Sequence, residues 1–207
     1  MQKFRNILKT KAPKLKGDAG YVIIMLLALA CTMLVSEPAQ ADINNCTITL
    51  SPSGQSYGEL LKSRQTFVST AQGNATALTP RSSNLTIICP QAEKMHLRFI
   101  GNRLNDGDFS FGQKGKVSAI LSSAVLDGNA VQLTKTKHKG VAIAPAIADS
   151  QTLSSDDEIT IGDTSSLQGT NLNAVLTITP YLMESAFVVP DAYVQEELLN
   201  IELVPVN

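Results

Sequence analysis

Apolar and polar residues alternate with a period of two in most segments that follow residue 45. The pattern is clearest in Cys46–Leu50 and Asn84–Cys89, where the apolar side chains occupy every second position. Successive side chains of a strand point to opposite faces, so residues of the same parity line one face. In each segment the cysteine shares its parity with the apolar residues. The pattern therefore predicts two strands with inward-facing thiols, and it favours a disulfide between Cys46 and Cys89.

Similar alternation, interrupted by turn residues, predicts further strands along the chain. These strands are expected at Met95–Ile100, Val117–Leu121, Ile159–Ile161, Asn173–Tyr181, Phe187–Val189 and Leu199–Leu203. A hairpin is expected where Asp127-Gly128-Asn129 joins residues 124–126 to residues 131–133.

Three segments are less regular. Val141–Ile147 is apolar but contains Pro145, which restricts it to an edge strand or a loop. Residues 67–80 are rich in Ser, Thr, Ala and Gln and fit a loop or a weak edge strand, and residues 193–199 fit one helical turn. Together the segments predict an all-β protein, an antiparallel immunoglobulin-like sandwich of roughly eight to ten strands.

The N-terminus has the three parts of a secretory signal peptide. A basic region is followed by the mostly apolar run Tyr21–Val35, and then by the small-residue site Ala39-Gln40-Ala41. The run is shorter than the roughly 20 residues that a membrane span needs. We therefore expect a signal peptide over residues 1–41, cleavage between Ala41 and Asp42, and one mature domain over residues 42–207.

Other interpretations of the N-terminus stay open. The apolar run is a candidate for an uncleaved anchor, and Cys31 is a candidate for lipidation, although Ala28–Ala30 does not resemble the usual leucine-led motif. Cleavage after Ala30 is a further alternative, and it would leave a longer N-terminal tail on the mature protein.

Charge and cysteine content narrow the range of functions. The chain has a net charge of −1, and because the signal peptide carries six basic and two acidic residues, the mature part has a net charge of −5. Nothing in this balance favours nucleic acid as a partner. With Cys31 removed, two cysteines remain, which in an exported chain favours a disulfide over a metal site. We expect no cofactor and no metal.

The sequence offers no catalytic set, so we expect that the protein is not an enzyme. It has only two histidines, which leaves little room for a Ser-His-Asp or Cys-His arrangement. His96 has the outward parity of its strand and is expected on the surface. His138 lies among lysines and is expected in a solvated loop.

Two clusters of charge are expected on the surface. Lys135, Lys137 and Lys139 alternate, so they are predicted on one strand face, where they either protect a sheet edge or bind an acidic glycan or partner. The acidic residues Asp156–Glu158 and Asp163 lack the spacing of a calcium-binding EF-hand loop, and they are expected to form an acidic surface turn rather than a calcium site.

Several short motifs together resemble those of a known family. The chain resembles the fimbrial (pilus) subunits of the chaperone–usher pathway of Gram-negative bacteria, in particular the divergent fimbrial-protein-like members. The resemblance covers most of residues 46–207 and depends on Cys46-Thr-x-x-Leu50, Tyr57-Gly58, Asn84–Pro90, Leu97–Gly101 and Val131–Leu133.

The resemblance implies an incomplete sandwich that lacks its final strand. In this family a periplasmic chaperone lends a strand, an outer-membrane usher assembles the subunits, and the N-terminal extension of a neighbouring subunit replaces the chaperone. Strand addition of this kind depends on backbone ladder bonds and on alternate apolar side chains. Leu199, Ile201 and Leu203 would form the edge that pairs with the chaperone and with the donor strand.

The resemblance also implies a location and a role. The protein would pass through the periplasm and become a structural part of a cell-surface fimbria. Only Asp42–Asn45 precede Cys46 in the expected mature chain, so a terminal or tip subunit is expected rather than a repeating shaft subunit. The alternatives are a single-domain adhesin that binds a host receptor and a stand-alone exported β-sandwich binding protein.

Overall fold

The computed structural model describes residues 46–70, 73–163, 167–188 and 198–205. Its contacts divide the chain into two units, Met1–Gln40 and Ala41–Asn207. The described residues all lie in the second unit. Among them, no helix is long and apolar enough to cross a membrane.

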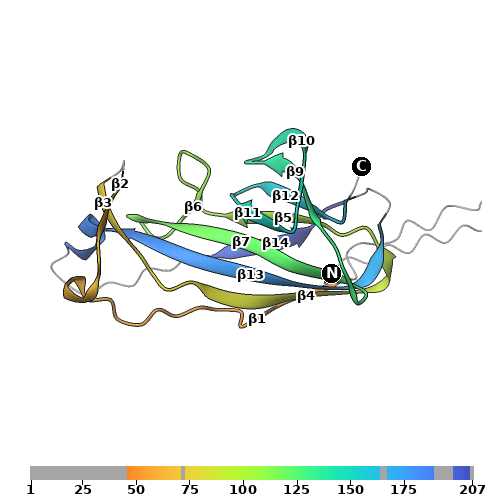
Figure 1. Cartoon of the computed structure of the whole chain (residues 1–207), viewed down its shortest axis with the longest axis horizontal. Helices are drawn as coiled ribbons and strands as arrows, with labels where there is room; N and C mark the ends of the chain where they lie inside the picture. The colour runs from red at the N-terminus through yellow and green to blue at the C-terminus, as the bar shows by residue number, and fades with distance from the viewer. Residues whose placement is uncertain (1–45, 71–72, 164–166, 189–197, 206–207) are drawn as a thin grey trace, which may run out of the picture. The chain divides into compact units, whose positions relative to one another are not determined.

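The larger sheet is built around three long antiparallel strands, β4 (Arg81–Glu93), β13 (Gly169–Met183) and β7 (Gly115–Leu126). β13 lies in the middle, with β4 on one side and β7 on the other (Figure 1). The shorter strands of this sheet are β1 (Thr47–Ser51), β2 (Val68–Thr70), β3 (Gly73–Ala77), β6 (Phe109–Ser110), β8 (Asn129–Ala130) and β11 (Ser150–Leu153). β1 pairs with β4, and β11 pairs with β7.

The smaller sheet has the strand order β10-β9-β12-β5-β14 in the described residues, and each neighbouring pair is antiparallel. Its strands are β5 (His96–Gly101), β9 (Leu133–His138), β10 (Val141–Ala148), β12 (Asp157–Ile161) and β14 (Leu199–Leu203). Two short 3₁₀ helices, η3 (Lys62–Arg64) and η4 (Glu184–Phe187), lie outside the sheets.

The core is the layer of side chains between the two sheets. β4 shows how the sequence forms it: Ser83, Leu85, Ile87 and Cys89 are buried, while the residues between them are exposed or half-buried. The buried cluster combines residues from both sheets, including Leu85, Leu97, Phe99, Leu121, Ile159, Leu172 and Leu176. The prediction of an all-β antiparallel sandwich is therefore confirmed.

Local predictions have mixed outcomes. The hairpin lies where the pattern predicts it, since the Asp127-Gly128 turn joins β7 to β8 with Leu126 opposite Asn129. Its second strand is Asn129–Ala130 rather than residues 131–133, and Leu133 begins β9 of the smaller sheet. Val141–Ala148 is an edge strand, and residues 67–80 contain the short strands β2 and β3. The strand predicted at Phe187–Val189 is wrong at its start, because Phe187 ends η4. The helical turn predicted at residues 193–199 lies mainly outside the described residues, and Leu199 begins β14.

Gly115 marks a place where the fold needs a residue without a side chain. A Cβ atom built there would lie 2.7 Å from the carbonyl oxygen of Tyr181 and 2.8 Å from that of Phe111. Both neighbours are backbone atoms of the larger sheet and its β6–β7 loop, so they have little freedom to move away.

We predict that Gly115→Ala lowers the free energy of unfolding by about 1–3 kcal/mol, the usual cost of forcing extra atoms into a packed site. Urea unfolding followed by circular dichroism measures the change. Gly54→Ala is the matched control, because a Cβ atom at Gly54 meets nothing within 4 Å. Equal midpoints for the two variants would contradict the prediction.

Candidate functional site

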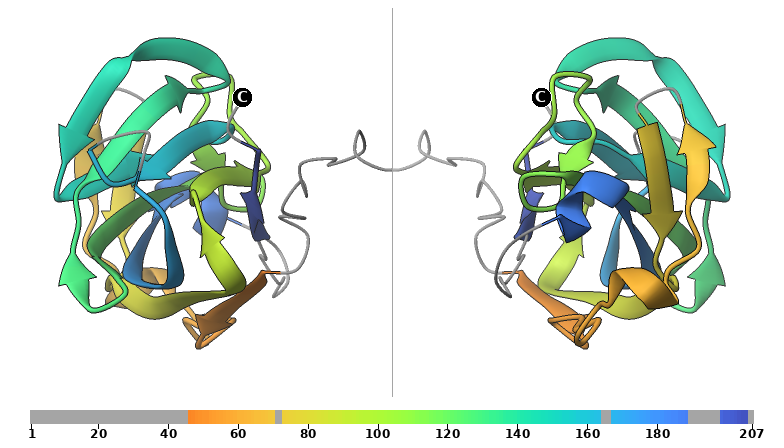
Figure 2. Two further views of the ribbon diagram at one scale, coloured as in Figure 1. Left: turned by 90° about the vertical axis from the view of Figure 1, so that its right-hand side faces the viewer. Right: turned by 90° about the vertical axis from the view of Figure 1, so that its left-hand side faces the viewer.

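Each sheet ends in a short strand on the same side of the sandwich. β1 is an edge of the larger sheet, paired with β4 from Thr47 to Ser51, and β14 is an edge of the smaller sheet, paired with β5. Both views in Figure 2 place β1 (orange) and β14 (dark blue) on one side. Within the described residues, neither strand pairs with a second neighbour. We call the side formed by β1 and β14 the open side.

The inward-facing side chains of the open side are incompletely buried. They pack against the core cluster but keep intermediate exposure, and they are Cys46, Ile48, Leu50, Leu199, Ile201 and Leu203. One strand further in, Leu85 and Ile87 on β4 and Leu97 on β5 are 0% exposed. Apolar side chains that face the core therefore remain accessible to solvent along both edges of the open side.

The opposite side of the sandwich is closed by the chain itself. β10 ends at Ala148 in the smaller sheet, and β11 begins at Ser150 in the larger one, so the single residue Asp149 links the two sheets. The Gln151 side-chain amide donates hydrogen bonds to the carbonyl oxygens of Leu133 (3.0 Å) and Ala146 (2.7 Å). The open side has no such link in the described residues.

The predicted disulfide is present at the open side. Cys46, immediately before β1, is bonded to Cys89 on β4, with a Cα–Cα distance of 4.2 Å. The bond joins residues 43 apart in sequence, for which the loop-entropy model gives a contribution of about 3–4 kcal/mol. It also fixes a five-residue edge strand that pairs with a single neighbour, β4, in the part of the chain that the structure describes.

A network of charges covers β5, β12 and β9 of the smaller sheet. The Glu158 carboxylate accepts hydrogen bonds from Arg98 Nη2 (2.6 Å) and Lys137 Nζ (2.9 Å), and its Oε2 lies 3.1 Å from His96 Nε2. Burial alone would raise the pKa of Glu158, but the hydrogen bonds from Arg98, Lys137 and His96 outweigh it and lower that pKa to about 2. The bond to Glu158 also raises the pKa of Arg98.

Asp157, the residue before Glu158, points to the other face of β12 and is 0% exposed. Its Oδ2 lies 2.8 Å from Lys135 Nζ, and its Oδ1 lies 3.0 Å from His138 Nδ1. The backbone N–H groups of Ser154 and Lys139 also donate to this carboxylate. The hydrogen bonds offset the cost of burying its charge.

These contacts correct three sequence-based predictions. His96 is buried rather than on the surface, since its ring lies between Glu158 and Thr160 Oγ1 (2.7 Å). Asp157 and Glu158 are buried ion-pair partners rather than parts of an acidic surface turn. The lysines do not share one face, because the irregular pairing of β9 with β12 turns Lys135 inward to Asp157 and Lys137 outward to Glu158. They do not protect an edge either, because β9 lies between β10 and β12.

His138 is also not in a loop, since it ends β9 and contacts Asp157. In the described residues, the fold therefore pairs most of these charges internally, and no group of three or more His, Cys, Asp or Glu residues is placed to hold a metal ion.

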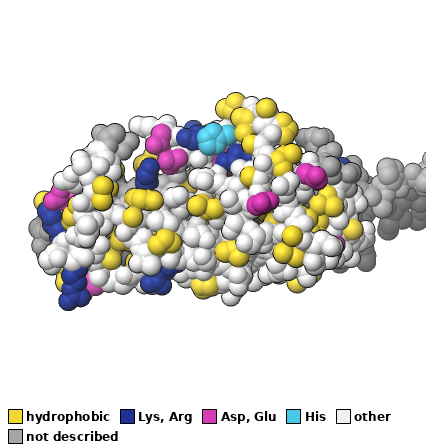
Figure 3. Space-filling model, viewed as in Figure 1, with side chains coloured by type: hydrophobic (Ala, Val, Ile, Leu, Met, Phe, Trp, Pro, Cys, Tyr) yellow, Lys and Arg dark blue, Asp and Glu magenta, His cyan; other side chains and the backbone are white. Residues whose placement is uncertain are grey.

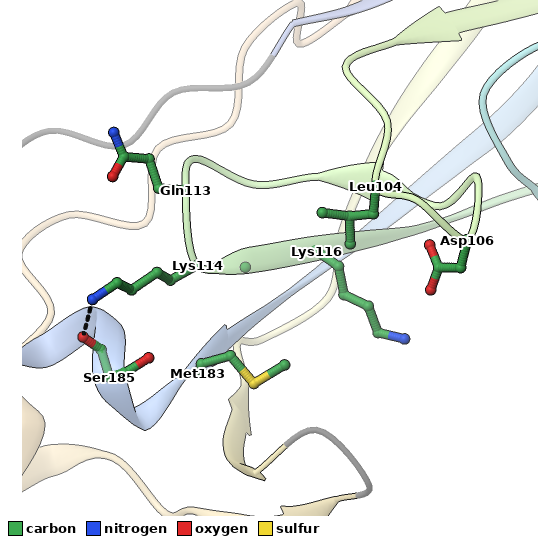
Figure 4. Close-up of a pocket in the computed structure, with 8 residues that line it drawn as sticks. Leu104, Asp106, Gln113, Lys114, Lys116, Met183 and Ser185 are labelled. Carbon is green, nitrogen blue, oxygen red and sulfur yellow. Dashed lines mark hydrogen bonds between the residues drawn. The ribbon is translucent and has the colours of Figure 1, made fainter.

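A surface pocket lies beside the start of β7 (Figure 4). Lys114 Nζ donates to the carbonyl oxygen of Ser185 (3.3 Å), and Lys116 Nζ lies 3.6 Å from Asp108 Oδ2. The pocket is lined by Leu104, Asp106, Gln113, Lys114, Gly115, Lys116, Met183 and Ser185. This lining contains neither histidine nor cysteine and offers no pair of groups arranged as nucleophile and base.

Comparison with known proteins does not assign the chain to a family. No protein-family model matches the chain, and no curated protein matches it. Among solved structures, the P pilus rod subunit PapA aligns with 77% of this chain and 99% of its own, at 13% sequence identity and a TM-score of 0.32. A similarity at that level does not establish a shared fold or function.

The structure brings together part of what the sequence predicted. Leu199, Ile201 and Leu203 lie on an edge strand and face the core. Ala41 and Asp42, the predicted cleavage site, lie outside the described residues. Ile48 and Leu50 form the second half of the open side and were not among the predicted edge residues, although their shared parity with Cys46 was a usable signal.

We predict that the free energy of unfolding falls as the pH drops from about 5 to about 2. The pKa of Glu158 is about 2 in the folded protein against an ordinary 4.5, so its stabilising effect is complete above about pH 5 and is lost through the folded pKa. The expected contribution is at most about 3 kcal/mol. Urea unfolding at several pH values measures it.

The Glu158→Gln variant should be destabilised at pH 7 and should show a flatter pH dependence between about pH 5 and 2. Glu59→Gln is the control, because Glu59 is exposed on the surface. If the two variants kept the same pH profile, the network would have no measurable role in stability.

Proposed function

We propose that this protein is a structural, non-enzymatic subunit of a bacterial surface fimbria that accepts a strand from another chain at its open side. The observation that carries the proposal is the incomplete burial of inward-facing apolar side chains on both β1 and β14. A strand inserted there would cover the inward-facing side chains of β1 and β14 at once. Its backbone would also form hydrogen bonds with the free edge of β14.

The chemistry of β14 suits strand addition. Leu199, Ile201 and Leu203 face the core, and the residues between them, Asn200 and Glu202, are exposed. The strand contains no proline, and its pairing with β5 runs without a register shift. A regular edge with alternating apolar residues provides both ladder bonds and side-chain pockets for an incoming strand.

The sequence resemblance to chaperone–usher subunits supports the same role. Its Cys46–Leu50 motif ends in β1, the Asn84–Pro90 motif lies within β4, and the Leu97–Gly101 motif lies in β5. These segments are three of the four strands that flank or adjoin the open side. In this proposal a periplasmic chaperone supplies the strand first, and the outer-membrane usher then mediates its replacement by a strand from another subunit.

The proposal includes export by a signal peptide cleaved between Ala41 and Asp42, passage through the periplasm and display at the cell surface. A terminal or tip position follows only if cleavage occurs there, since four residues before Cys46 are too few to donate a strand. Sequencing the mature N-terminus tests this part. A start close to Cys31 would argue for a subunit that also donates.

We predict that Leu203→Asp lowers recovery of the complex with the cognate periplasmic chaperone at least tenfold. The substitution places an unpaired charge among apolar side chains that an incoming strand must cover. Asn200→Asp introduces the same charge on the outward face of β14 and is the matched control. Affinity capture of a tagged chaperone after co-expression measures recovery, and equal recovery of both variants would exclude β14 as the accepting edge.

A second experiment keeps the proposal testable if Leu203→Asp fails to fold. A synthetic peptide of about ten residues with alternating apolar positions should raise the unfolding midpoint of the parent protein, and the midpoint should rise further, roughly with the logarithm of peptide concentration, above the Kd. A peptide of the same composition with apolar residues grouped at one end is the control. A parent protein that is a stable, soluble monomer and does not respond to either peptide would instead indicate a stand-alone binding domain.

A further inference from the structure

The edge strand opposite β14 in the smaller sheet is apolar and exposed. β10 consists only of valine, alanine, isoleucine and proline, and its first seven residues are exposed. Val141 is 67% exposed, Ile143 38% and Ile147 49%. Figure 3 shows hydrophobic side chains gathered over β10, beside the charges at the end of β9. A cluster of this kind on a folded protein marks a contact surface.

β10 is poorly suited to accept a strand through its backbone. Pro145 lacks an N–H group, so it cannot donate to a ladder. The pairing of β10 with β9 also shifts between Ala142, which lies opposite Lys137, and Ala146, which lies opposite Lys135. Since the edge is irregular, a partner would have to bind through side chains rather than by strand addition.

The sequence of β10 points to a second copy of the same chain as that partner. Residues 142–148 have the sequence Ala-Ile-Ala-Pro-Ala-Ile-Ala, which is the same in both directions about Pro145. When two such strands lie antiparallel and centred on Pro145, Ile143 of each copy meets Ile147 of the other. A two-fold interface requires this reciprocity, in which the same patch serves both subunits.

The charges at the two ends of β10 favour the antiparallel arrangement. Lys137, His138 and Lys139 precede the strand, and the exposed Asp149 follows it. Antiparallel packing places the basic end of one copy beside the acidic end of the other, whereas parallel packing would place like charges together. Each of these groups already has a partner within its own chain: Lys137 contacts Glu158, His138 contacts Asp157, Lys139 lies 3.7 Å from Asp108, and Asp149 accepts a hydrogen bond from Gln132. The charges therefore set the orientation more than the affinity.

We propose that β10 is a self-association surface, on which two copies of this chain pack antiparallel about Pro145 through Ile143 and Ile147. A contact of one strand from each copy buries less than the roughly 1,000 Å² expected of a stable interface. The dimer is therefore weak in solution and becomes significant where copies are concentrated. The proposal does not depend on what binds at the open side.

Disulfide trapping tests the proposal on the oxidised, exported chain, either alone or bound to a strand-donating partner. We expect Pro145→Cys to bond to itself, because the two-fold axis passes through residue 145. A mixture of Ile143→Cys and Ile147→Cys chains should bond across the pair. Neither isoleucine variant should bond to itself, since in each case the two thiols would lie several residues apart along the strands.

Val68→Cys is the control for random collision, because Val68 is 65% exposed on the distant edge strand β2. Adding Ile147→Lys to Pro145→Cys should reduce bonding at least tenfold, and adding Val68→Lys should not. Self-bonding of Ile143→Cys, or bonding of Pro145→Cys no more frequent than that of Val68→Cys, would overturn the proposal. If this test fails, the proposal that the open side accepts a strand is unaffected, because the contact between the two copies does not involve β1 or β14.

Discussion

A sandwich depends on each sheet covering the inner face of the other, and among the described residues that condition is not met along one side. The inner strands β4, β13 and β5 have hydrogen-bonded neighbours on both sides, and their inward side chains are almost fully buried. β1 and β14 have a neighbour on one side only in the described residues, and their inward side chains stay half-exposed. Apolar area left in contact with water forgoes roughly 25 cal/mol per Å². The fold therefore gains free energy from any segment that covers this side.

The disulfide and the charge network stabilise the two sheets independently of that missing cover. Cys46–Cys89 fixes β1 to β4, so this edge of the larger sheet is held even without a second neighbour. In the smaller sheet, Glu158 joins β12 to β5 through Arg98 and to β9 through Lys137. Buried ion pairs are weak evidence for stability in general, because desolvation opposes the attraction. Here each carboxylate has several donors, which is the condition under which such pairs are retained.

The alternation of side chains along each strand explains which sequence-based predictions are correct and which are wrong. Parity is a local property, and it correctly placed Cys46 and Cys89 on inward faces and predicted the sandwich. It also assigned His96 to the outward face, which is correct, but outward does not mean exposed. Glu158 and Thr160 contact the two ring nitrogens, and both residues come from β12, more than 60 residues away in sequence. Which strands become neighbours depends on long-range pairing, and this cannot be read from the period of a single segment.

The same limit applies to the acidic residues and to the open side. Asp156–Glu158 has the composition of a surface turn, and Asp156 does lie in one, but Asp157 and Glu158 are buried because β12 places them beside Lys135 on β9 and Arg98 on β5. The alternation of β14 predicts an inward apolar face, but it does not show that the strand is an edge. The expectation of an incomplete sandwich came from the family resemblance, whereas the half-exposed apolar side chains on β1 and β14 are seen in the structure.

The two edges of the smaller sheet differ in a way that assigns them different roles. β14 is short, regular and free of proline, and its apolar residues all face the core. β10 contains Pro145, is irregularly paired, and exposes its apolar residues outside the core. Backbone addition at β10 would lack a donor at its centre, and side-chain packing on the outer face of β14 would meet Asn200 and Glu202. Strand acceptance therefore fits β14 and surface contact fits β10, because the chemistry of each edge opposes the other's mode of binding.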